Sequence, residues 1–327
     1  MHMKNLFETS AKLKRGALLG LAIALGAGAA AAAFPPSVSA LKAVTAGQSQ
    51  SLAVYNQFQK YVKNSAKTPA SLIQARNYLL NHIKEADSWR ATLMVLQLEN
   101  AQKARLDAFS KKLFPEKVQK TIDSAVRKNG PQAGLTYSNL MKRITDPGVR
   151  ALLTETFAYG YKLETSEGMY YPVMHYEGFK PFKPYIGKDI AAYIDLMAVD
   201  SNKPALSDAA IVISWDELIN RGLALESFVK KYPKSNRTAA VNDRMKLVRT
   251  FVFYGSNNTP AYEYGTSGEP TTIDPELRQA YEKAVQNGAG DSRILKTIQR
   301  VLGLLDASGN QWNGNIEKFL HDFNELG

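Results

Sequence analysis

Apolar residues recur at intervals of three and four along most of this chain, and no other feature of the sequence constrains its fold as strongly. The first stripe consists of Leu52, Tyr55, Phe58 and Val62. This spacing places side chains on one face of an α-helix. New stripes follow a proline or a capping residue, as is typical of helix starts, at Thr68-Pro69, Ser88, Pro115 and Asp146-Pro147. Because the connections are short, residues 41–156 are expected to form an antiparallel helical bundle.

A second helical region is expected from residue 207 to residue 327. Apolar stripes bounded by turn residues predict helices over 207–231, 236–254, 274–286, 292–305 and 315–324. Within them, Ala224-Leu-Glu-Ser-Phe-Val-Lys-Lys-Tyr-Pro-Lys-Ser235 is similar to the helix-turn joint of tetratricopeptide-like proteins. The sequence therefore predicts a mainly α protein: a helical bundle, an aromatic-rich irregular segment, and a second helical, tetratricopeptide-like part.

Residues 157–206 connect these two regions and differ from both in composition. Ten Phe and Tyr residues fall within residues 157–193, interrupted by repeated Gly and Pro. Gly and Pro at this density exclude a long helix. We therefore expect an irregular loop or a short hairpin from Glu164 to Lys188, followed by a helix from Asp189 to Val199.

The first forty residues have the pattern of an export signal. A basic start precedes an uncharged run from Gly16 to Ala33, and Val38-Ser39-Ala40 offers a small-residue cleavage site. Residues 1–40 are therefore expected to be a cleaved signal peptide, which makes the mature chain secreted or cell-surface. The alternative is an uncleaved N-terminal anchor, because the residues from Gly16 to Leu41 carry no charge and are long enough to span a membrane.

Positive charge is concentrated in the first half of the chain. Residues 41–156 contain 18 Lys and Arg against 8 Asp and Glu, whereas residues 157–327 contain 19 against 21. An exported basic surface meets anionic wall polymers and membrane headgroups rather than nucleic acid. The alternative is that these charges only solvate helix faces. The chain contains no Cys, which excludes disulfides, thiolate metal sites and a Cys nucleophile.

The candidate ligand-binding residues lie in the aromatic segment. They are Tyr170, Tyr171, His175, Tyr176 and Phe179. Tyrosine offers an apolar ring face together with a hydroxyl group, a combination that suits glycans or peptides at a partly wet surface. The alternative is that these rings pack against the helices as a local core.

Glu167 and Glu177 in the same segment are the candidate pair for an alternative function, hydrolysis of an envelope glycan. A glycosidase needs two carboxyl groups facing one bond, one of them with a raised pKa. Sequence spacing does not distinguish this pair from ordinary surface acids. The four histidines are scattered, and no serine-hydrolase elbow or phosphate loop is present. Enzymatic activity is therefore not the expected function.

A partial calcium loop lies between the last two expected helices. Asp306, Ser308, Asn310 and Glu317 occupy positions 1, 3, 5 and 12 of an EF-hand loop. Gln311 stands where the sharp turn of such a loop requires glycine. The favoured interpretation is a polar helix connection that binds no cofactor, with calcium as the alternative.

Three longer strings are Gly160-Tyr-Lys-Leu-Glu-Thr-Ser-Glu-Gly-Met-Tyr-Tyr-Pro172, Tyr193-Ile-Asp-Leu-Met-Ala-Val199 and Tyr254-Gly-Ser-Asn-Asn-Thr-Pro260. They resemble a family of uncharacterised exported proteins of Gram-positive spore-forming bacteria, over about residues 160–260. The resemblance implies export and no particular activity.

The expected function is binding at the cell envelope. The basic residues 41–156 are expected to engage anionic wall or membrane polymers, and the Tyr-rich segment to contact a second ligand, a glycan or a protein. Two alternatives remain, the glycan hydrolase described above and a structural or assembly protein of the cell surface.

Overall fold

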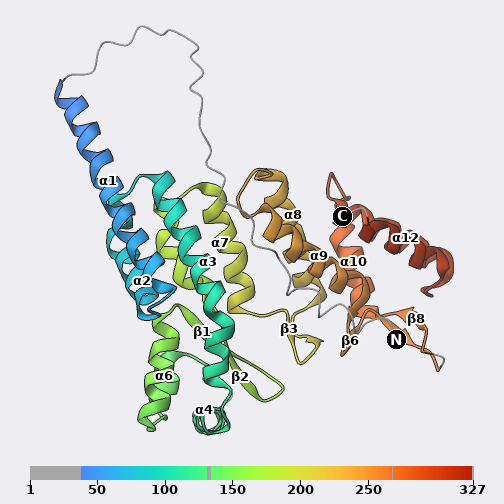
Figure 1. Ribbon diagram of the computed structural model, residues 1–327. Coiled ribbons are helices and arrows are strands. Elements are labelled where there is room, and N and C mark those ends of the chain that lie inside the picture. The colour runs from blue at the N-terminus through green and yellow to red at the C-terminus, as the bar shows by residue number, and fades with distance from the viewer. Residues whose placement is uncertain (1–37, 131–133, 267, 326–327) are drawn as a thin grey trace. The chain divides into compact units, whose positions relative to one another are not determined.

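The computed structural model describes residues 38–130, 134–266 and 268–325 (Figure 1). Contacts divide the chain into two units, residues 1–43 and 44–327. Most of the expected signal peptide lies outside the described residues, and its expected cleavage site, 38–40, falls at the start of the first helix. Among the described residues, no helix is both long enough and apolar enough to cross a membrane.

The described chain is mainly helical, which confirms that the protein is mainly α. The α-helices are α1 (Val38–Ser65), α2 (Ala70–His82), α3 (Ser88–Leu113), α4 (Glu116–Asn129), α5 (Tyr137–Met141), α6 (Pro147–Ala158), α7 (Lys188–Asn202), α8 (Trp215–Lys231), α9 (Thr238–Tyr254), α10 (Pro275–Val285), α11 (Arg293–Ser308) and α12 (Gly314–Glu325). Two 3-10 helices are η3 (Ile83–Glu85) and η5 (Tyr176–Tyr185). The strands pair as hairpins: β1 (Tyr161–Ser166) with β2 (Met169–Met174), β3 (Leu206–Ser207) with β4 (Ala210–Ile211), β5 (Gly255–Ser256) with β6 (Thr259–Pro260), and β7 (Tyr262–Tyr264) with β8 (Pro270–Ile273).

Side-chain caps begin several helices close to the expected positions. The side chain of Asp87 accepts a hydrogen bond of 2.9 Å from the backbone N–H of Arg90, and Asp146 caps α6 in the same way. The expectation that Ser88 caps α3 is therefore wrong by one residue, because Ser88 is already helical and Asp87 holds the extended conformation of a cap.

The β1–β2 hairpin is one of the two forms expected for the aromatic segment, whereas a second hairpin replaces part of an expected helix. Glu167 and Gly168 join β1 to β2 with φ values of 52° and 75°, as a two-residue turn requires. The helix expected from residue 207 instead begins at Trp215, capped by Ser214. Residues Leu206–Ile211 form a hairpin because Asp208 and Ala209 both adopt positive φ, which interrupts any right-handed helix.

One hydrophobic core runs through residues from Val54 in α1 to Phe323 in α12. This core contains residues on both sides of the expected boundaries at 156 and 206, so it does not mark these boundaries. The division of the chain into four segments stays a prediction. A smaller cluster lies among α4, α5, α6 and the first hairpin, and contains Ile122, Leu153 and Tyr170. Figure 1 shows α3 beside α2, and α8 beside α9; α3 also packs on β2 and η5, and α8 on α7 and α10.

Candidate functional site

A hollow of about 600 Å³ beside α4 is the candidate functional site, and we call it the basic groove. Its lining includes the cations Lys117, Lys120, Lys128 and Arg143, the hydroxyl residues Thr121, Ser124 and Thr145, and the carboxylates Glu116 and Asp146. Residues three and four apart share one face of a helix. Because Ile122 and Ala125 of α4 are buried in the smaller core cluster, the lysines and hydroxyls are carried by the remaining surface of the helix.

The cations of the basic groove are only partly neutralised. Lys117 pairs with Asp146 at 2.7 Å and Lys120 with Glu116 at 2.5 Å. No ion pair or hydrogen bond to a described residue engages the side-chain ammonium of Lys128, and Arg143 donates only to the amide oxygen of Asn129, at 3.2 Å. Two positive charges therefore exceed the carboxylates in this lining.

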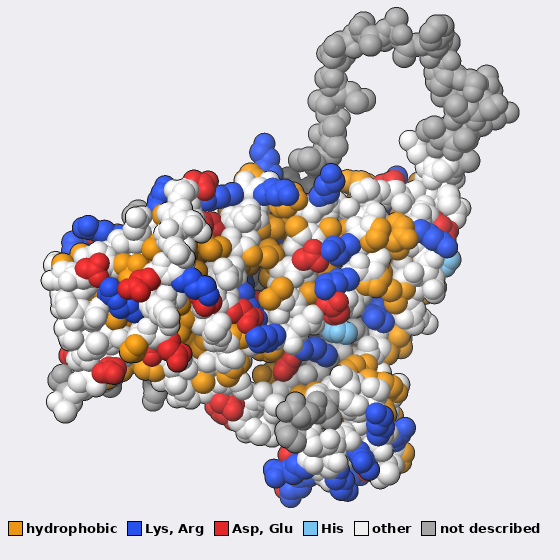
Figure 2. Space-filling view, turned by 180° about the vertical axis from the view of Figure 1, so that it is seen from behind, with side chains coloured by type: hydrophobic (Ala, Val, Ile, Leu, Met, Phe, Trp, Pro, Cys, Tyr) orange, Lys and Arg blue, Asp and Glu red, His pale blue; other side chains and the backbone are white. Residues whose placement is uncertain are grey.

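The position of the groove agrees with the distribution of charge on the surface. Figure 2 shows Lys and Arg side chains gathered at the lower end of the view, the end at which Figure 1 places α4. The hydrogen bond from Lys117 and the cap on α6 hold the pKa of Asp146 below its usual value, so this carboxylate is charged and neutralises Lys117. An anionic ligand would therefore meet Lys128 and Arg143 first.

The candidate aromatic residues separate into a buried group and an accessible group. Tyr170, Tyr176 and Phe179 retain only 6, 7 and 3 % of their surface exposed. Burial raises the pKa of Tyr176 far above its usual value, and its hydroxyl donates to Glu99 at 2.6 Å. The faces of these three rings are therefore packed inside the protein, whereas Tyr171 and His175 remain partly exposed.

Tyr171 lies at the wall of a hollow of about 310 Å³, which we call the Tyr171 pocket. Glu164, Asp200 and Arg244 also line it, as does the edge of Tyr176. Arg244 pairs with Asp200 at 2.6 Å, and Glu164 with Lys162 at 2.5 Å. This pocket combines one accessible ring with paired charges and brings together the first hairpin, α7 and α9.

His175 lies in a positively charged environment. Burial lowers its pKa, and the nearby cations Lys162 and Arg76 lower it further. The imidazole is therefore neutral at pH 7, because the usual His pKa is already below that value. A neutral ring can accept or donate a hydrogen bond, but it adds no charge to this surface.

Glu167 and Glu177 do not form a catalytic arrangement in the described structure. Glu167 is exposed in the β1–β2 turn, and its backbone N–H donates to Asp208. Glu177 pairs with Lys180 at 2.9 Å and accepts a hydrogen bond from Asn202 at 2.7 Å, and these contacts lower its pKa. A general acid needs the opposite shift, and neither residue lines the Tyr171 pocket.

A guanidinium group lies among the residues of the partial calcium loop. Arg278 of α10 pairs with Asp306 at 2.7 Å and donates to the side-chain oxygen of Asn310. The hydroxyl of Ser308 donates to the carbonyl of Gln311 at 2.6 Å, and Glu317 is exposed on α12. The side-chain oxygens of Asp306, Ser308 and Asn310 thus make internal contacts. Within the described ranges, no group of three acidic or His side chains is arranged for a metal.

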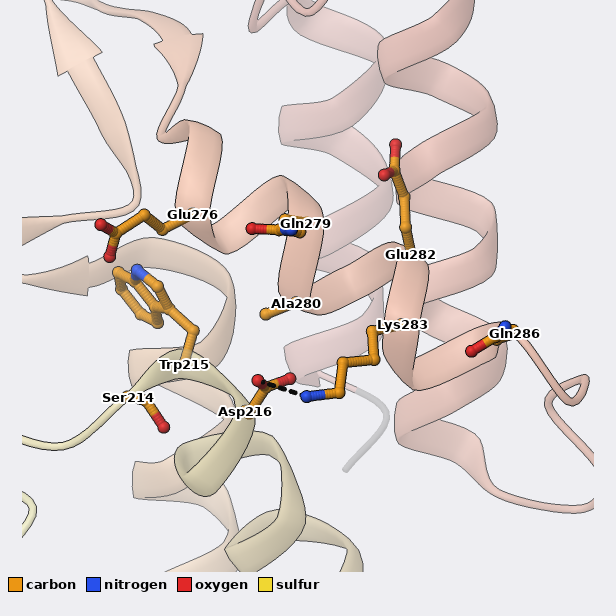
Figure 3. A pocket seen from close by; sticks show the side chains of 9 residues that line it. All are labelled: Ser214, Trp215, Asp216, Glu276, Gln279, Ala280, Glu282, Lys283 and Gln286. Carbon is orange, nitrogen blue, oxygen red and sulfur yellow. Dashed lines mark hydrogen bonds and ion pairs between the residues drawn. The ribbon is translucent and has the colours of Figure 1, made fainter.

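A hollow of about 590 Å³ lies between the start of α8 and one side of α10, and Figure 3 shows its lining. Asp216 and Lys283 form an ion pair of 2.8 Å across it, while Glu276 lies on the side of Trp215. Asp216 and Glu276 belong to the first turns of their helices. Acidic side chains there stabilise the helix dipole, so their presence is explained without a ligand.

Sequence reasoning missed a buried carboxylate with four partners, Glu99 of α3. It is 3 % exposed, and it contacts Lys103, Arg237 and two tyrosine hydroxyls. The only signal in the sequence is the spacing of four residues between Glu99 and Lys103. That pattern is common on solvated helices and does not indicate burial.

Comparison with protein-family models, with curated proteins and with solved structures finds no match for this chain.

Proposed function

We propose that the protein is an exported binding protein of the cell envelope, and that the basic groove engages an anionic wall or membrane polymer. The observation that carries this proposal is the excess of cations over carboxylates in the groove, with Lys128 unpaired among the described residues. A phosphate or carboxylate can approach Lys128 without displacing an existing ion pair. Binding at this lysine therefore does not require an ion pair to be broken first.

The groove offers the two kinds of contact that a phosphate- or carboxylate-bearing polymer uses. Lys128 and Arg143 supply charge, and the hydroxyl of Ser124 can donate a hydrogen bond to an anionic oxygen. A polymer that repeats its anionic group can contact several such surface cations at once. Each contact is weak in water and screened by salt, so affinity should arise from the number of contacts.

Two finer features belong to the same proposal. We infer an antiparallel bundle for residues 41–156 and a tetratricopeptide-like arrangement for residues 207–327. The packing of α8 on α9 around the turn at Tyr232 and Pro233 supports the tetratricopeptide-like arrangement.

We also infer that the Tyr171 pocket contacts a second ligand, a glycan or a protein, because Tyr171 is the accessible candidate ring that lines it.

Sedimentation of the purified full chain with isolated Gram-positive cell walls tests the proposal, using walls with and without their teichoic acid. The triple variant Lys120→Gln, Lys128→Gln, Arg143→Gln should lose most of the wall binding at low salt. Its matched control is Lys188→Gln, Lys234→Gln, Lys246→Gln, which removes three exposed cations outside the groove.

Binding of the wild type should fall steeply as salt rises from about 50 to 500 mM, because screening shortens the range of each interaction. Equal binding by the groove variant and its control would show that net charge alone acts. Binding that is unaffected by salt and by removal of teichoic acid would contradict the proposal.

A further inference from the structure

A second cationic surface lies in the half of the chain whose net charge is slightly negative. Arg293, Lys296 and Arg300 of α11 line one side of a hollow of about 360 Å³. Their spacing of three and four residues places them on one face of the helix. Phe319 and Phe323 of α12 line the same hollow, so it combines cations with an aromatic wall.

Two of the three cations on α11 lack a partner among the described residues. Lys296 and Arg300 make no side-chain ion pair or hydrogen bond with any residue in the described ranges. Asp322 is the one acid among the described lining residues, and it pairs with Lys318 at 3.0 Å. An anion in this hollow would therefore meet Lys296 and Arg300 without displacing an ion pair between described residues.

Arg249 of α9 gives an independent indication at the same place. It is 2 % exposed, and its Nε has no hydrogen-bond partner. Its guanidinium carbon lies 5.1 Å from the centroid of the Phe323 ring, and that of Arg293 lies 5.8 Å from the same centroid. Burial of a charge without a hydrogen-bonded counter-charge is costly, and burial lowers the pKa of Arg249.

Glu226 makes no ion pair with Arg249 in the described structure, although its charge favours the charged form of this arginine. The Glu226 carboxylate accepts hydrogen bonds of 2.5 Å from the Ser292 hydroxyl and the Arg293 backbone N–H. Among the described residues, this buried carboxylate is therefore used by the start of α11.

We propose that the hollow between α11 and α12 binds an amphipathic anion, a phosphate or carboxylate group that carries a hydrocarbon chain. Lys296 and Arg300 would hold the anionic group by charge-assisted hydrogen bonds. Phe319 and Phe323 would pack against the hydrocarbon. The volume of about 360 Å³ is at the lower end of the roughly 300–1,000 Å³ typical of small-molecule sites.

This ligand differs from that of the basic groove, whose lining contains no aromatic residue. A ligand in the hollow would lie against Phe323, whose ring also contacts the guanidinium of Arg249. Binding here does not depend on the proposed function, because the two hollows share no lining residue.

Calorimetric titration of the full chain with monomeric octyl phosphate tests the proposal. We expect one site, and an affinity about tenfold or more weaker in the double variant Lys296→Gln, Arg300→Gln, because each removed cation loses a charge-assisted contact. The double variant Lys234→Gln, Lys246→Gln removes the same charge elsewhere and should bind as the wild type does. Inorganic phosphate and octyl glucoside each supply half of the ligand and should bind much more weakly.

Sedimentation with vesicles separates the two sources of such an anion. Binding to phosphatidylglycerol vesicles, lost in the Lys296→Gln, Arg300→Gln variant, would show that the anion is a bilayer lipid, whereas octyl phosphate binding alone would show a free amphiphile. The variant Arg249→Met should bind octyl phosphate more weakly without losing thermal stability. Equal affinity in wild type and Lys296→Gln, Arg300→Gln, or equal binding of octyl glucoside, overturns the proposal.

Discussion

Arg237 and Glu99, which are 138 residues apart in the sequence, form an ion pair in which Nε and Nη2 both donate to Oε2 of the carboxylate, at 2.9 and 2.6 Å. The other oxygen, Oε1, accepts from the hydroxyls of Tyr176 and Tyr193 at 2.6 Å each and lies 2.7 Å from the ammonium of Lys103. One buried carboxylate therefore joins α3, η5, α7 and the residue that precedes α9.

The substitution Glu99→Gln should destabilise the fold strongly. It keeps the shape of the side chain but leaves Arg237 without its counter-charge, and removing one partner of a buried ion pair costs about 3–5 kcal/mol. Urea unfolding followed by circular dichroism measures the loss. The control Asp107→Asn breaks the pair of Asp107 with Lys111, whose side chains are 82 and 71 % exposed, and should change the free energy of unfolding by less than about 1 kcal/mol.

Stability should also fall at acid pH through Glu99. Burial alone would raise its pKa, but Lys103, Arg237 and the hydrogen bonds from Lys103 and Tyr176 outweigh burial and hold the pKa below the usual 4.5. A carboxyl with a lowered folded pKa stabilises the protein fully above its unfolded pKa, and this stabilisation is lost as pH falls through the folded value. Unfolding measured from pH 6 to pH 3 should show a smaller pH dependence in Glu99→Gln than in the wild type; equal slopes would contradict this assignment.

Asp87 should contribute to acid sensitivity at lower pH. Its carboxylate caps α3 and accepts hydrogen bonds from the Ser51 hydroxyl, at 2.5 Å, and from Arg90. Desolvation opposes ionisation, but these contacts lower the pKa of Asp87 from 3.8 to about 2. The stabilisation is therefore complete above about pH 4 and disappears toward pH 2. Asp87→Ala should cost about 1–2 kcal/mol in thermal or urea unfolding, whereas the neighbouring Ser88→Ala should cost less.

The substitution Ala209→Gly should stabilise the protein. Ala209 holds φ at 58°, a left-handed conformation that costs a side-chain-bearing residue about 1 kcal/mol relative to glycine. Ala210→Gly is the matched control: it lies in the adjoining strand, so it should destabilise the protein by a few tenths of a kcal/mol or more. Differential scanning calorimetry distinguishes the two, and a lower melting temperature for Ala209→Gly would show that the turn is not strained.

Arg278, rather than a metal ion, should stabilise the connection between α11 and α12. Calcium at about 1 mM, in the range bound by weak EF-hand sites, should leave the melting temperature unchanged, and so should a chelator. Arg278→Gln should lower it, because Asp306 and Asn310 lose their charged donor. A calcium-dependent rise in the melting temperature of the wild type would contradict this interpretation.

Local sequence signals located most helices and included a hairpin among the two forms expected for the aromatic segment, but they missed the later hairpins. Pro115, Asp146 and Pro275 stand at helix starts, where proline and side-chain caps act on the nearest backbone groups. The hairpin at Leu206–Ile211 was missed because its turn uses Asp208 and Ala209 in place of glycine, and its apolar run is equally compatible with a helix. The hairpin also makes hydrogen bonds with residues far along the chain. The backbone N–H of Ile211 donates to the Thr259 hydroxyl, and the backbone N–H of Asn258 donates to the Ala209 carbonyl.

The sequence predicted a basic surface in the first half of the chain, but not which of its residues form the candidate site. The count of Lys and Arg indicated a basic first half, but which lysines remain unpaired depends on where Asp146 and Glu116 lie relative to α4. The aromatic cluster was visible as composition, whereas the burial of Tyr176 follows from its contact with Glu99, 77 residues away.

The sequence by itself determined the helical class of this protein, the excess of positive charge in its first half and the absence of cysteine chemistry. These properties depend on residue type and on spacing within a few positions. Only the tertiary structure decided which tyrosines face inward, that Arg278 pairs with Asp306, and that Arg249 lies buried beside Phe323. The physical reason is that burial and ion pairing reflect atoms brought together from distant parts of the chain, whereas helix formation and capping involve neighbours along it.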